Sequence, residues 1–308
     1  MARRLASLVG LLAAVATPAF PQEARPTPPE PGTSEIVAGQ IDRYERMTVP
    51  VTIGGQGPFR FMIDTGAQAT VVTSALRDRL SLPSLGHAML VGMVASKQVE
   101  VVRLDGLEFA ARVFDAIHAP LLEEQHIGAD GILGLDSLQD LRVLIDFRKQ
   151  NIAVDDSRAL GGNRGYEIVV RARRKLGRLI ITDAMVDGVR TAVIIDTGAQ
   201  GSMGNLALQR RLRAHRGLEV TTTDVTGAVT TSPVGFARTI EIGRMQLSGL
   251  PIAFADAPAF AALGLSAKPA MVLGMGDLRG FDRVAIDFAD RTVLFDLPVG
   301  SARDAAPG

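Results

Sequence analysis

The stretch Ile63-Asp64-Thr65-Gly66-Ala67-Gln68 occurs twice in this chain, and its second copy is Ile195-Asp196-Thr197-Gly198-Ala199-Gln200. Each copy ends an apolar run, residues 59–63 in the first case and 191–195 in the second, which is typical of a buried strand. A glycine two residues after each aspartate indicates a tight turn or a close backbone approach. Each copy therefore places one carboxylate on a tight loop at the end of a buried strand.

A single aspartate at the end of a strand usually caps a turn. Two identical copies favour another interpretation, because two repeats related by a pseudo-twofold axis would bring their loops together. Two carboxyl groups in contact cannot both ionise easily, so they hold one proton between them. Such a pair supplies an acid and a base at one site without a metal or a nucleophilic side chain. Asp64 and Asp196 are therefore the candidate catalytic residues.

The repeat extends beyond these six residues. Ile132-Leu133-Gly134-Leu135 in the first half corresponds to Val272-Leu273-Gly274-Met275 in the second, and residues 142–147 correspond to residues 283–288. Short segments of strand character and frequent turn signals surround these landmarks, whereas helix signals are few and short. The sequence therefore predicts an all-β protein with two similar lobes.

Local signals give the expected turns. Residues 54–58 and the polar residues 96–98 are predicted turns, and a short helix over 74–80 is expected to have Ser74 as its cap. The basic run at 171–175 is typical of an exposed hairpin tip, with substrate docking as the alternative.

Composition excludes several classes of function. The chain has 308 residues, enough for two domains, and its formal net charge is zero, which argues against a nucleic acid or an anionic surface as partner. The absence of cysteine excludes disulfides, thiol catalysis and thiolate metal sites. The four histidines show no ligand spacing, and the chain has neither a serine nucleophile elbow nor a phosphate-binding loop. We therefore expect no metal and no cofactor.

The N-terminus has the pattern of a secretory signal peptide. A basic start, Met1-Ala2-Arg3-Arg4, precedes an apolar segment of about a dozen residues, too short for a comfortable membrane span. We expect residues 1–19 to be the signal peptide, with an uncleaved anchor as the alternative, and the Pro-rich residues 20–34 to be a disordered spacer. This predicts an exported protein, periplasmic or extracellular, with no membrane contact after cleavage.

The remaining chain divides at a glycine-rich segment. We predict an N-terminal lobe over residues 35–157, a linker over 158–165 and a C-terminal lobe over 166–298. Residues 299–308 are expected to form a loose tail.

With these landmarks in place, the chain resembles the retropepsin and pepsin superfamily of aspartic proteases over roughly residues 45–297. The two Asp-Thr-Gly-Ala stretches resemble the retroviral active-site loop. Asp130-Gly131-Ile132-Leu133-Gly134-Leu135 is similar to the pepsin-type segment that passes behind that loop. The resemblance implies two pseudo-twofold-related β-barrel lobes with an active-site cleft between them, similar to a retropepsin dimer fused into one chain.

The resemblance also implies roles for the repeated residues. Asp64 and Asp196 would activate a water for hydrolysis of a peptide bond without a covalent intermediate, so the substrate would be a polypeptide and the protein an aspartic endopeptidase. Thr65 and Thr197 would form hydrogen bonds to the opposite lobe and lock the two loops together.

The backbone of each loop would keep the carboxyl groups coplanar, and the residues that give this support are Gly66, Ala67, Gly198 and Ala199. Segments around Gly92 and Gly227 fall where mobile flaps would cover the cleft. The chain departs from the pepsin pattern, because its two tyrosines, Tyr44 and Tyr166, both lie outside these segments and leave no candidate for the tyrosine of the pepsin flap.

Three alternatives stay open at this point. The same fold could be a peptide-binding or assembly module, although such a module has no need of two carboxylates in repulsion. Each lobe could pair with a lobe of another chain, whereas the fused arrangement predicts a monomer. Asp146 and Asp287 also recur between the halves, as a second carboxylate pair or, in the interpretation we favour, as turn caps or members of ion pairs.

Overall fold

The structure, a computed structural model, describes residues 47–212 and 218–298. It also describes the backbone of four short preceding strands, which are β1 (Ala6–Leu8), β2 (Ala14–Ala16), β3 (Ile36–Val37) and β4 (Gln40–Ile41). The predicted spacer at 20–34 and the predicted tail at 299–308 lie outside the described residues. Within the described part of the chain, no helix has the length and apolar character needed to cross a membrane.

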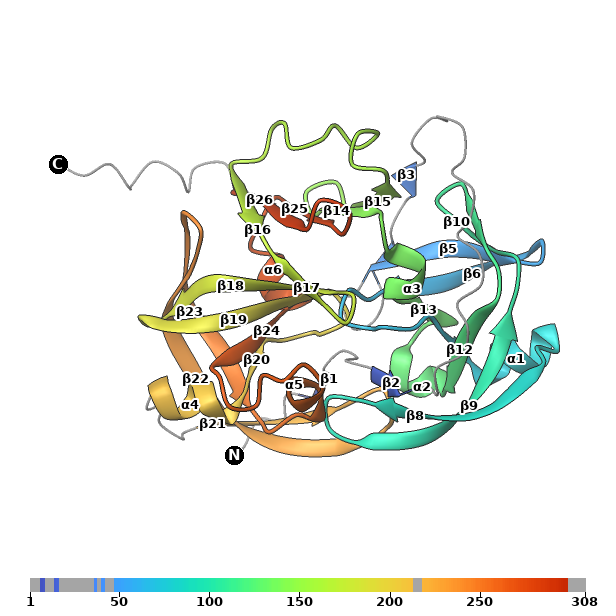
Figure 1. Ribbon diagram of the computed structural model, residues 1–308, viewed down its shortest axis with the longest axis horizontal. Coiled ribbons are helices and arrows are strands. Elements are labelled where there is room, and N and C mark those ends of the chain that lie inside the picture. Colours follow the sequence, from blue (N-terminus) through green and yellow to red (C-terminus); the bar gives the residue numbers. More distant parts are fainter. Residues whose placement is uncertain are drawn as a thin grey trace.

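The first lobe is a curled eleven-stranded sheet (Figure 1). Its strands follow the order β11-β10-β5-β6-β13-β7-β12-β9-β8-β2, and β4 pairs with β5. The main strands are β5 (Met47–Ile53), β6 (Gln56–Ile63), β7 (Val71–Thr73), β8 (Ser84–Val91), β9 (Ser96–Leu104), β10 (Leu107–Phe109), β11 (Arg112–Phe114), β12 (Ile117–Leu122) and β13 (Gly131–Leu133). The helices are α1 (Ser74–Leu80), α2 (Glu124–Ile127) and α3 (Leu135–Leu138).

The second lobe is a nine-stranded sheet in the order β1-β21-β22-β23-β20-β24-β19-β18-β17, which an additional pairing of β22 with β18 closes on itself. Its strands after β1 are β17 (Arg173–Lys175), β18 (Arg178–Val186), β19 (Val189–Asp196), β20 (Met203–Gly204), β21 (Leu218–Thr223), β22 (Val229–Ile242), β23 (Met245–Phe254) and β24 (Ala270–Gly274). The helices are α4 (Leu206–Leu212), α5 (Pro258–Ala262) and α6 (Met275–Leu278).

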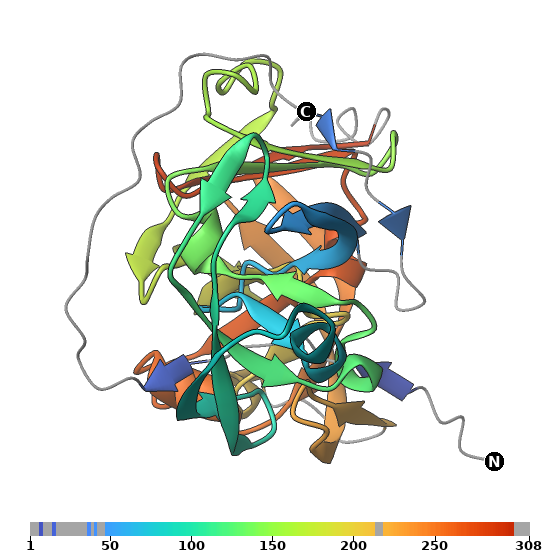
Figure 2. The ribbon, with the colours of Figure 1, turned by 90° about the vertical axis from the view of Figure 1, so that its right-hand side faces the viewer.

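A six-stranded sheet joins the two lobes along one side of the molecule (Figures 1 and 2). Its order is β16-β26-β25-β14-β15-β3, and its main strands are β14 (Arg142–Asp146), β15 (Asn151–Asp155), β16 (Ile168–Arg171), β25 (Arg283–Asp287) and β26 (Thr292–Asp296). At its centre β14 pairs antiparallel with β25, and Leu144 lies opposite Ala285. Each lobe therefore gives one hairpin to the shared sheet.

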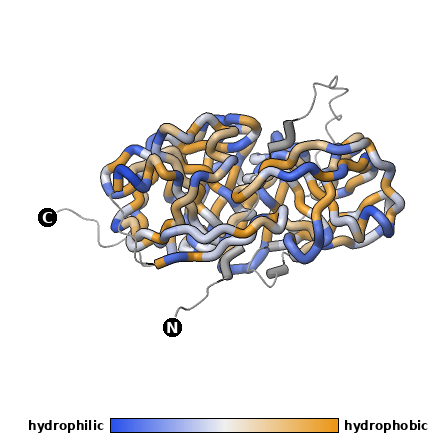
Figure 3. The backbone as a smooth tube through the Cα atoms, turned by 90° about the horizontal axis from the view of Figure 1, so that it is seen from below, coloured by the Kyte–Doolittle hydropathy of each residue, from blue (hydrophilic) through white to orange (hydrophobic). Residues whose placement is uncertain are grey.

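The same elements recur in the same order in both lobes. Each loop-bearing strand lies beside a later parallel strand: β6 pairs with β13, where Ile63 faces Leu133, and β19 pairs with β24, where Ile195 faces Leu273. Hydrophobic side chains from both lobes and from the shared sheet form one continuous core, and Figure 3 shows apolar segments in both halves. The prediction of an all-β protein with two similar lobes is confirmed.

The recurring pair Asp146 and Asp287 has a structural role. Asp287 forms a fully buried ion pair with Arg142, with 2.8 Å between Oδ2 and Nε. The Oδ1 atoms of both aspartates cap turns. Asp146 Oδ1 accepts the Lys149 N–H at 2.9 Å, and Asp287 Oδ1 accepts the Asp290 N–H at 2.7 Å. The interpretation of these residues as turn caps and ion-pair members is confirmed.

Two local predictions need correction. The predicted turn at 96–98 is the first part of β9, and the turn lies at 92–95 instead. These polar residues are exposed on a hairpin, so their polarity reflects contact with solvent and not a turn. The predicted turn at 54–58 is also shorter than expected, because β6 already begins at Gln56.

The cap of α1 is Thr73 and not Ser74. The Thr73 hydroxyl accepts the Leu76 N–H at 3.1 Å, so the capping residue stands just before the first helical residue. Two adjacent hydroxyl residues gave the same sequence signal, and only the backbone geometry separates them.

Candidate active site

The two repeated loops lie face to face between the lobes. Asp64 directly follows β6, Asp196 ends β19, and both side chains are completely buried. A Cβ atom added to Gly66 would collide with the Asp196 carboxyl group, and one added to Gly198 would collide with that of Asp64. The loops therefore approach so closely that glycine alone fits at both positions.

Backbone N–H groups hold the inner oxygen of each carboxyl group. Asp64 Oδ1 accepts hydrogen bonds from Gly66 N at 2.8 Å and Ala67 N at 2.9 Å. In the second loop, Asp196 Oδ1 accepts them from the amides of Gly198 at 2.9 Å and Ala199 at 3.1 Å. The loop glycines and alanines therefore fix the orientation of both acids through their main chain.

Two threonines tie the loops across the lobe boundary. Thr65 Oγ1 donates to the Ile195 carbonyl oxygen at 2.9 Å, and Thr197 Oγ1 donates to the Ile63 carbonyl oxygen at 2.7 Å. Each hydroxyl also accepts the N–H of the other threonine, at 3.1 and 3.2 Å. These four buried hydrogen bonds make the position of one loop depend on the other.

The two carboxyl groups approach each other between the loops, since each lies where a Cβ atom on the glycine of the opposite loop would be. Their outer oxygens, Asp64 Oδ2 and Asp196 Oδ2, have no hydrogen-bond partner among the described residues. A proton on one of the acids supplies the donor for a hydrogen bond between them. Burial, followed by the charge of Asp196, raises the pKa of Asp64 well above its ordinary value. Burial also raises the pKa of Asp196 to about 6, although the hydrogen bond with Asp64 acts to lower it. Because the two raised pKa values belong to one interacting pair, the acids lose their protons one after the other and pass through a state that holds a single proton.

A second set of hydrogen bonds supports each loop from behind. Thr70 and Ser202 each stand six residues after a dyad aspartate, and they donate to Asp136 on α3 and Asp277 on α6. The same hydroxyl oxygens accept N–H groups at the ends of β13 and β24, both at 3.2 Å. Burial raises the pKa of both supporting carboxyl groups.

The predicted flap residues lie in two hairpin turns, which we call the first flap (β8 to β9) and the second flap (β21 to β22). Gly92 begins the turn between β8 and β9, and Gly227 lies in the turn between β21 and β22. Next to them, Met93 packs into a second-lobe cluster that contains Ala199, and Val225 packs into a first-lobe cluster that contains Ala67. Each hairpin tip therefore buries an apolar side chain in the opposite lobe, beside an active-site loop.

One carboxylate joins the two flap tips. Asp224 is completely buried, and its Oδ2 accepts the N–H groups of Val94 at 2.9 Å and Ala95 at 3.2 Å, both in the other flap. Its Oδ1 is held by the Thr226 hydroxyl at 2.5 Å. A Cβ atom at Gly92 would collide with this carboxylate, so the first flap can approach because it has glycine there.

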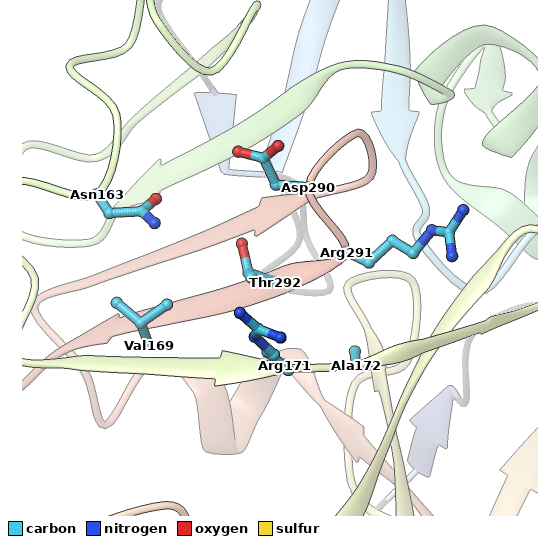
Figure 4. Close-up of a pocket in the computed structure, with 7 residues that line it drawn as sticks. All are labelled: Asn163, Val169, Arg171, Ala172, Asp290, Arg291 and Thr292. Atoms are coloured by element: carbon cyan, nitrogen blue, oxygen red, sulfur yellow. The ribbon is translucent and has the colours of Figure 1, made fainter.

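A cavity of about 560 Å³ opens elsewhere, on the shared sheet (Figure 4). It is lined by Asn163, Val169, Arg171, Ala172, Asp290, Arg291 and Thr292. None of these residues belongs to the loops or the flaps, so the cavity is separate from the dyad. The basic run begins in its wall and continues as the fully exposed strand β17, which confirms the expected exposure of this run.

The described residues contain no group of three or more histidine, aspartate or glutamate side chains that could hold a metal ion. The constellation instead consists of two coupled acids, fixed by amides and covered by two hairpins. Such an arrangement can take up and release a proton at one buried site.

Comparisons with protein families agree with this geometry. Residues 49–140 match the family described as "gag-polyprotein putative aspartyl protease", and residues 182–276 match the family described as "Aspartyl protease". Each match contains one of the repeated loops, and together they cover more than half of the chain. The chain belongs to the aspartyl proteases. A search of curated proteins found no match to this aspartyl protease.

Some residues of this two-domain aspartyl protease were missed by sequence reasoning. Thr70 and Ser202 carried a usable signal, since a hydroxyl residue recurs at the same distance after each dyad aspartate. Arg178, which contacts the first loop from the second domain, and Asp224 carried none, because their partners lie in the opposite domain.

Proposed function

We propose that this protein is an aspartic endopeptidase that hydrolyses polypeptides with Asp64 and Asp196 as its catalytic dyad. The observation that carries the proposal is the close approach of two completely buried carboxyl groups whose outer oxygens have no hydrogen-bond partner in the described chain. Family membership of both halves points in the same direction.

The chemistry follows from the single proton on the dyad. The ionised carboxylate takes a proton from a water molecule as the water oxygen attacks the scissile carbonyl carbon. The protonated carboxyl group gives its proton to the carbonyl oxygen, so a neutral diol intermediate forms without a covalent bond to the protein. On collapse of the diol, the ionised carboxylate takes the proton of one diol hydroxyl while the protonated carboxyl group gives its proton to the nitrogen of the leaving amine, so the dyad again carries one proton.

The test is cleavage of a quenched-fluorescence peptide library by Asp64→Asn and Asp196→Asn. Each variant should lose roughly a thousandfold or more in kcat/KM with an unchanged circular dichroism spectrum. Asp146→Asn is the matched control, because Asp146 also recurs between the halves but caps a turn, and it should retain turnover. Near wild-type turnover in either dyad variant would contradict the mechanism. Peptide binding without cleavage by the wild type would favour the binding-module alternative.

The proposal extends to export and to a single-chain site. The basic start and short apolar segment of residues 1–19 support export to the periplasm or the medium. Amino-terminal sequencing of protein from the periplasm of a Gram-negative host should find a start near residue 20. An intact Met1 on cytoplasmic protein would contradict export. One chain contributes both acids, which supports a monomeric enzyme.

A further inference from the structure

Arg178 reaches the first active-site loop from the second lobe. It is the first residue of β18, its side chain is completely buried, and its Nε donates a hydrogen bond of 2.8 Å to the Gly66 carbonyl oxygen. Gly66 in turn donates its N–H to Asp64. A cation from the lobe that carries Asp196 is thus anchored on the loop that carries Asp64.

The turn before Arg178 is fixed against the same loop. Gln68 Nε2 donates to the Leu176 carbonyl oxygen at 3.1 Å. A Cβ atom at Gly177 would lie 3.1 Å from a methyl group of Leu135, so this turn packs tightly on the first lobe. Two first-lobe side chains, Gln68 and Leu135, therefore fix the main chain of the turn from which the Arg178 side chain extends.

A buried cation this close to two acids has an electrostatic effect on them. Burial lowers the pKa of Arg178 to about 10, and the charges of Asp196 and Asp64 act against that shift, so the side chain stays cationic at neutral pH. The same charge acts to lower the pKa of Asp196. In a medium of low dielectric such a pair interacts more strongly than in water.

The other titratable groups around the loops have partners elsewhere. Asp136 and Asp277, on α3 and α6, accept the hydroxyls of Thr70 and Ser202 behind the loops. Asp224 in the second flap accepts amides of the first flap. The charge of Arg178, in contrast, acts on Asp196, and the charges of both dyad acids act on Arg178.

We propose, on the basis of the proposed peptidase function, that Arg178 is a positioning residue that fixes the first active-site loop and lends its positive charge to the dyad, so that the singly ionised pair forms at lower pH. Without this charge the anion is less stable, and both acids release their protons at higher pH. The acidic limb of the kcat/KM profile, which reports formation of the singly ionised pair, should then move to higher pH.

Two substitutions separate charge from contact. Arg178→Gln keeps an N–H donor for the Gly66 carbonyl but removes the charge, and Arg178→Lys keeps the charge but loses the planar group. We expect Arg178→Gln to move the acidic limb upward by about one pH unit and Arg178→Lys to leave it in place. Arg190→Gln is the control, because Arg190 lies in the same hairpin and pairs with Asp183 at the surface.

A limb that stays in place in Arg178→Gln would overturn the proposal, and so would an equal shift in Arg178→Gln and Arg178→Lys, which would assign the effect to packing. Arg178→Met serves as a second uncharged variant if Arg178→Gln does not fold. Carbon-13 NMR titration of labelled aspartate carboxyls measures the same shift without turnover. A wild type that titrates as expected but cleaves no peptide would therefore remove the proposed function and leave the role of Arg178 intact.

Discussion

At the scale of single residues, the dyad lowers the stability of the fold at neutral pH. Burial raises the folded-state pKa of Asp196 from 3.8 to about 6 and raises that of Asp64 as well. The folded state therefore binds more protons than the unfolded state between these two pH values, and the stabilising contribution is present below about pH 4 and lost as the pH rises through about 6. Asparagine removes the charge but keeps the Oδ1 acceptor.

We therefore expect Asp196→Asn to raise the free energy of unfolding by about 3 kcal/mol at pH 7, because the shift of its pKa to about 6 is removed. Urea denaturation at pH 7 and at pH 4.5 measures the effect, and the gain should shrink at the lower pH, where the wild-type dyad is more fully protonated. A variant that is less stable than the wild type at pH 7 would show that the buried charge carries little penalty.

Residue identity could be predicted only where the repeat marked it. Asp64 and Asp196 could be predicted from the sequence, because two identical loops in two similar lobes imply that their aspartates lie together. Arg178 was not, since its role arises from its contact with Gly66, which is 112 positions away in the chain. No local pattern contains that information.

At the scale of elements, the two flaps form one closed unit. Asp224 holds two first-flap amides with Oδ2 and its own loop with Oδ1. In Asp224→Asn an amide NH2 group replaces one carboxylate oxygen. When Oδ1 keeps its hydrogen bond with Thr226, the NH2 group takes the place of Oδ2. It cannot accept the two N–H groups of the first flap, so the hydrogen bonds across the lobe boundary are lost. Loss of a charge-assisted hydrogen bond costs about 1–3 kcal/mol of local stability.

Native-state hydrogen exchange should therefore show the Val94 and Ala95 amides exchanging roughly ten- to a hundredfold faster in Asp224→Asn. Asp187→Asn is the matched control, because Asp187 lies in a turn outside the flaps and its Oδ1 accepts a hydrogen bond of 2.8 Å from the Thr239 N–H. Equal protection of the flap amides in wild type and Asp224→Asn would mean that apolar insertion alone keeps the flaps closed.

Most elements could be predicted because alternating strands and short hairpins carry their signal locally. The strands over residues 59–63 and 191–195 and the helix over residues 74–80 match the sequence prediction. The turn of the first flap could not be placed from the sequence. Ser96 and its polar neighbours lie on a strand, and their exposure is set by the tertiary structure and not by a local turn. Local polarity cannot separate a turn from the outer face of a hairpin.

At the scale of the whole molecule, the interface between the lobes is completed within one chain. Residues of β14 pair with residues of β25 along the full length of both strands, and the fully buried ion pair of Arg142 and Asp287 joins the same two strands. The threonines of both loops and the tips of both flaps also cross the boundary. The sequence could predict two lobes, but this mutual insertion depends on the relative placement of distant segments.

This interface predicts that the protein is a monomer. The surfaces that a single-lobe protease would use to pair with a second copy are already occupied by the other half of the same chain, and a buried charge such as Arg142 would be exposed or unpaired if the lobes separated. Light scattering across a hundredfold range of protein concentration should give the mass of one chain, and specific activity should not change with dilution.

A mass of two chains, with activity that falls on dilution, would mean that lobes pair between molecules. Mixing Asp64→Asn with Asp196→Asn would then restore cleavage by forming intact dyads. The absence of such rescue, together with a monomeric mass, would establish that each chain builds its own dyad.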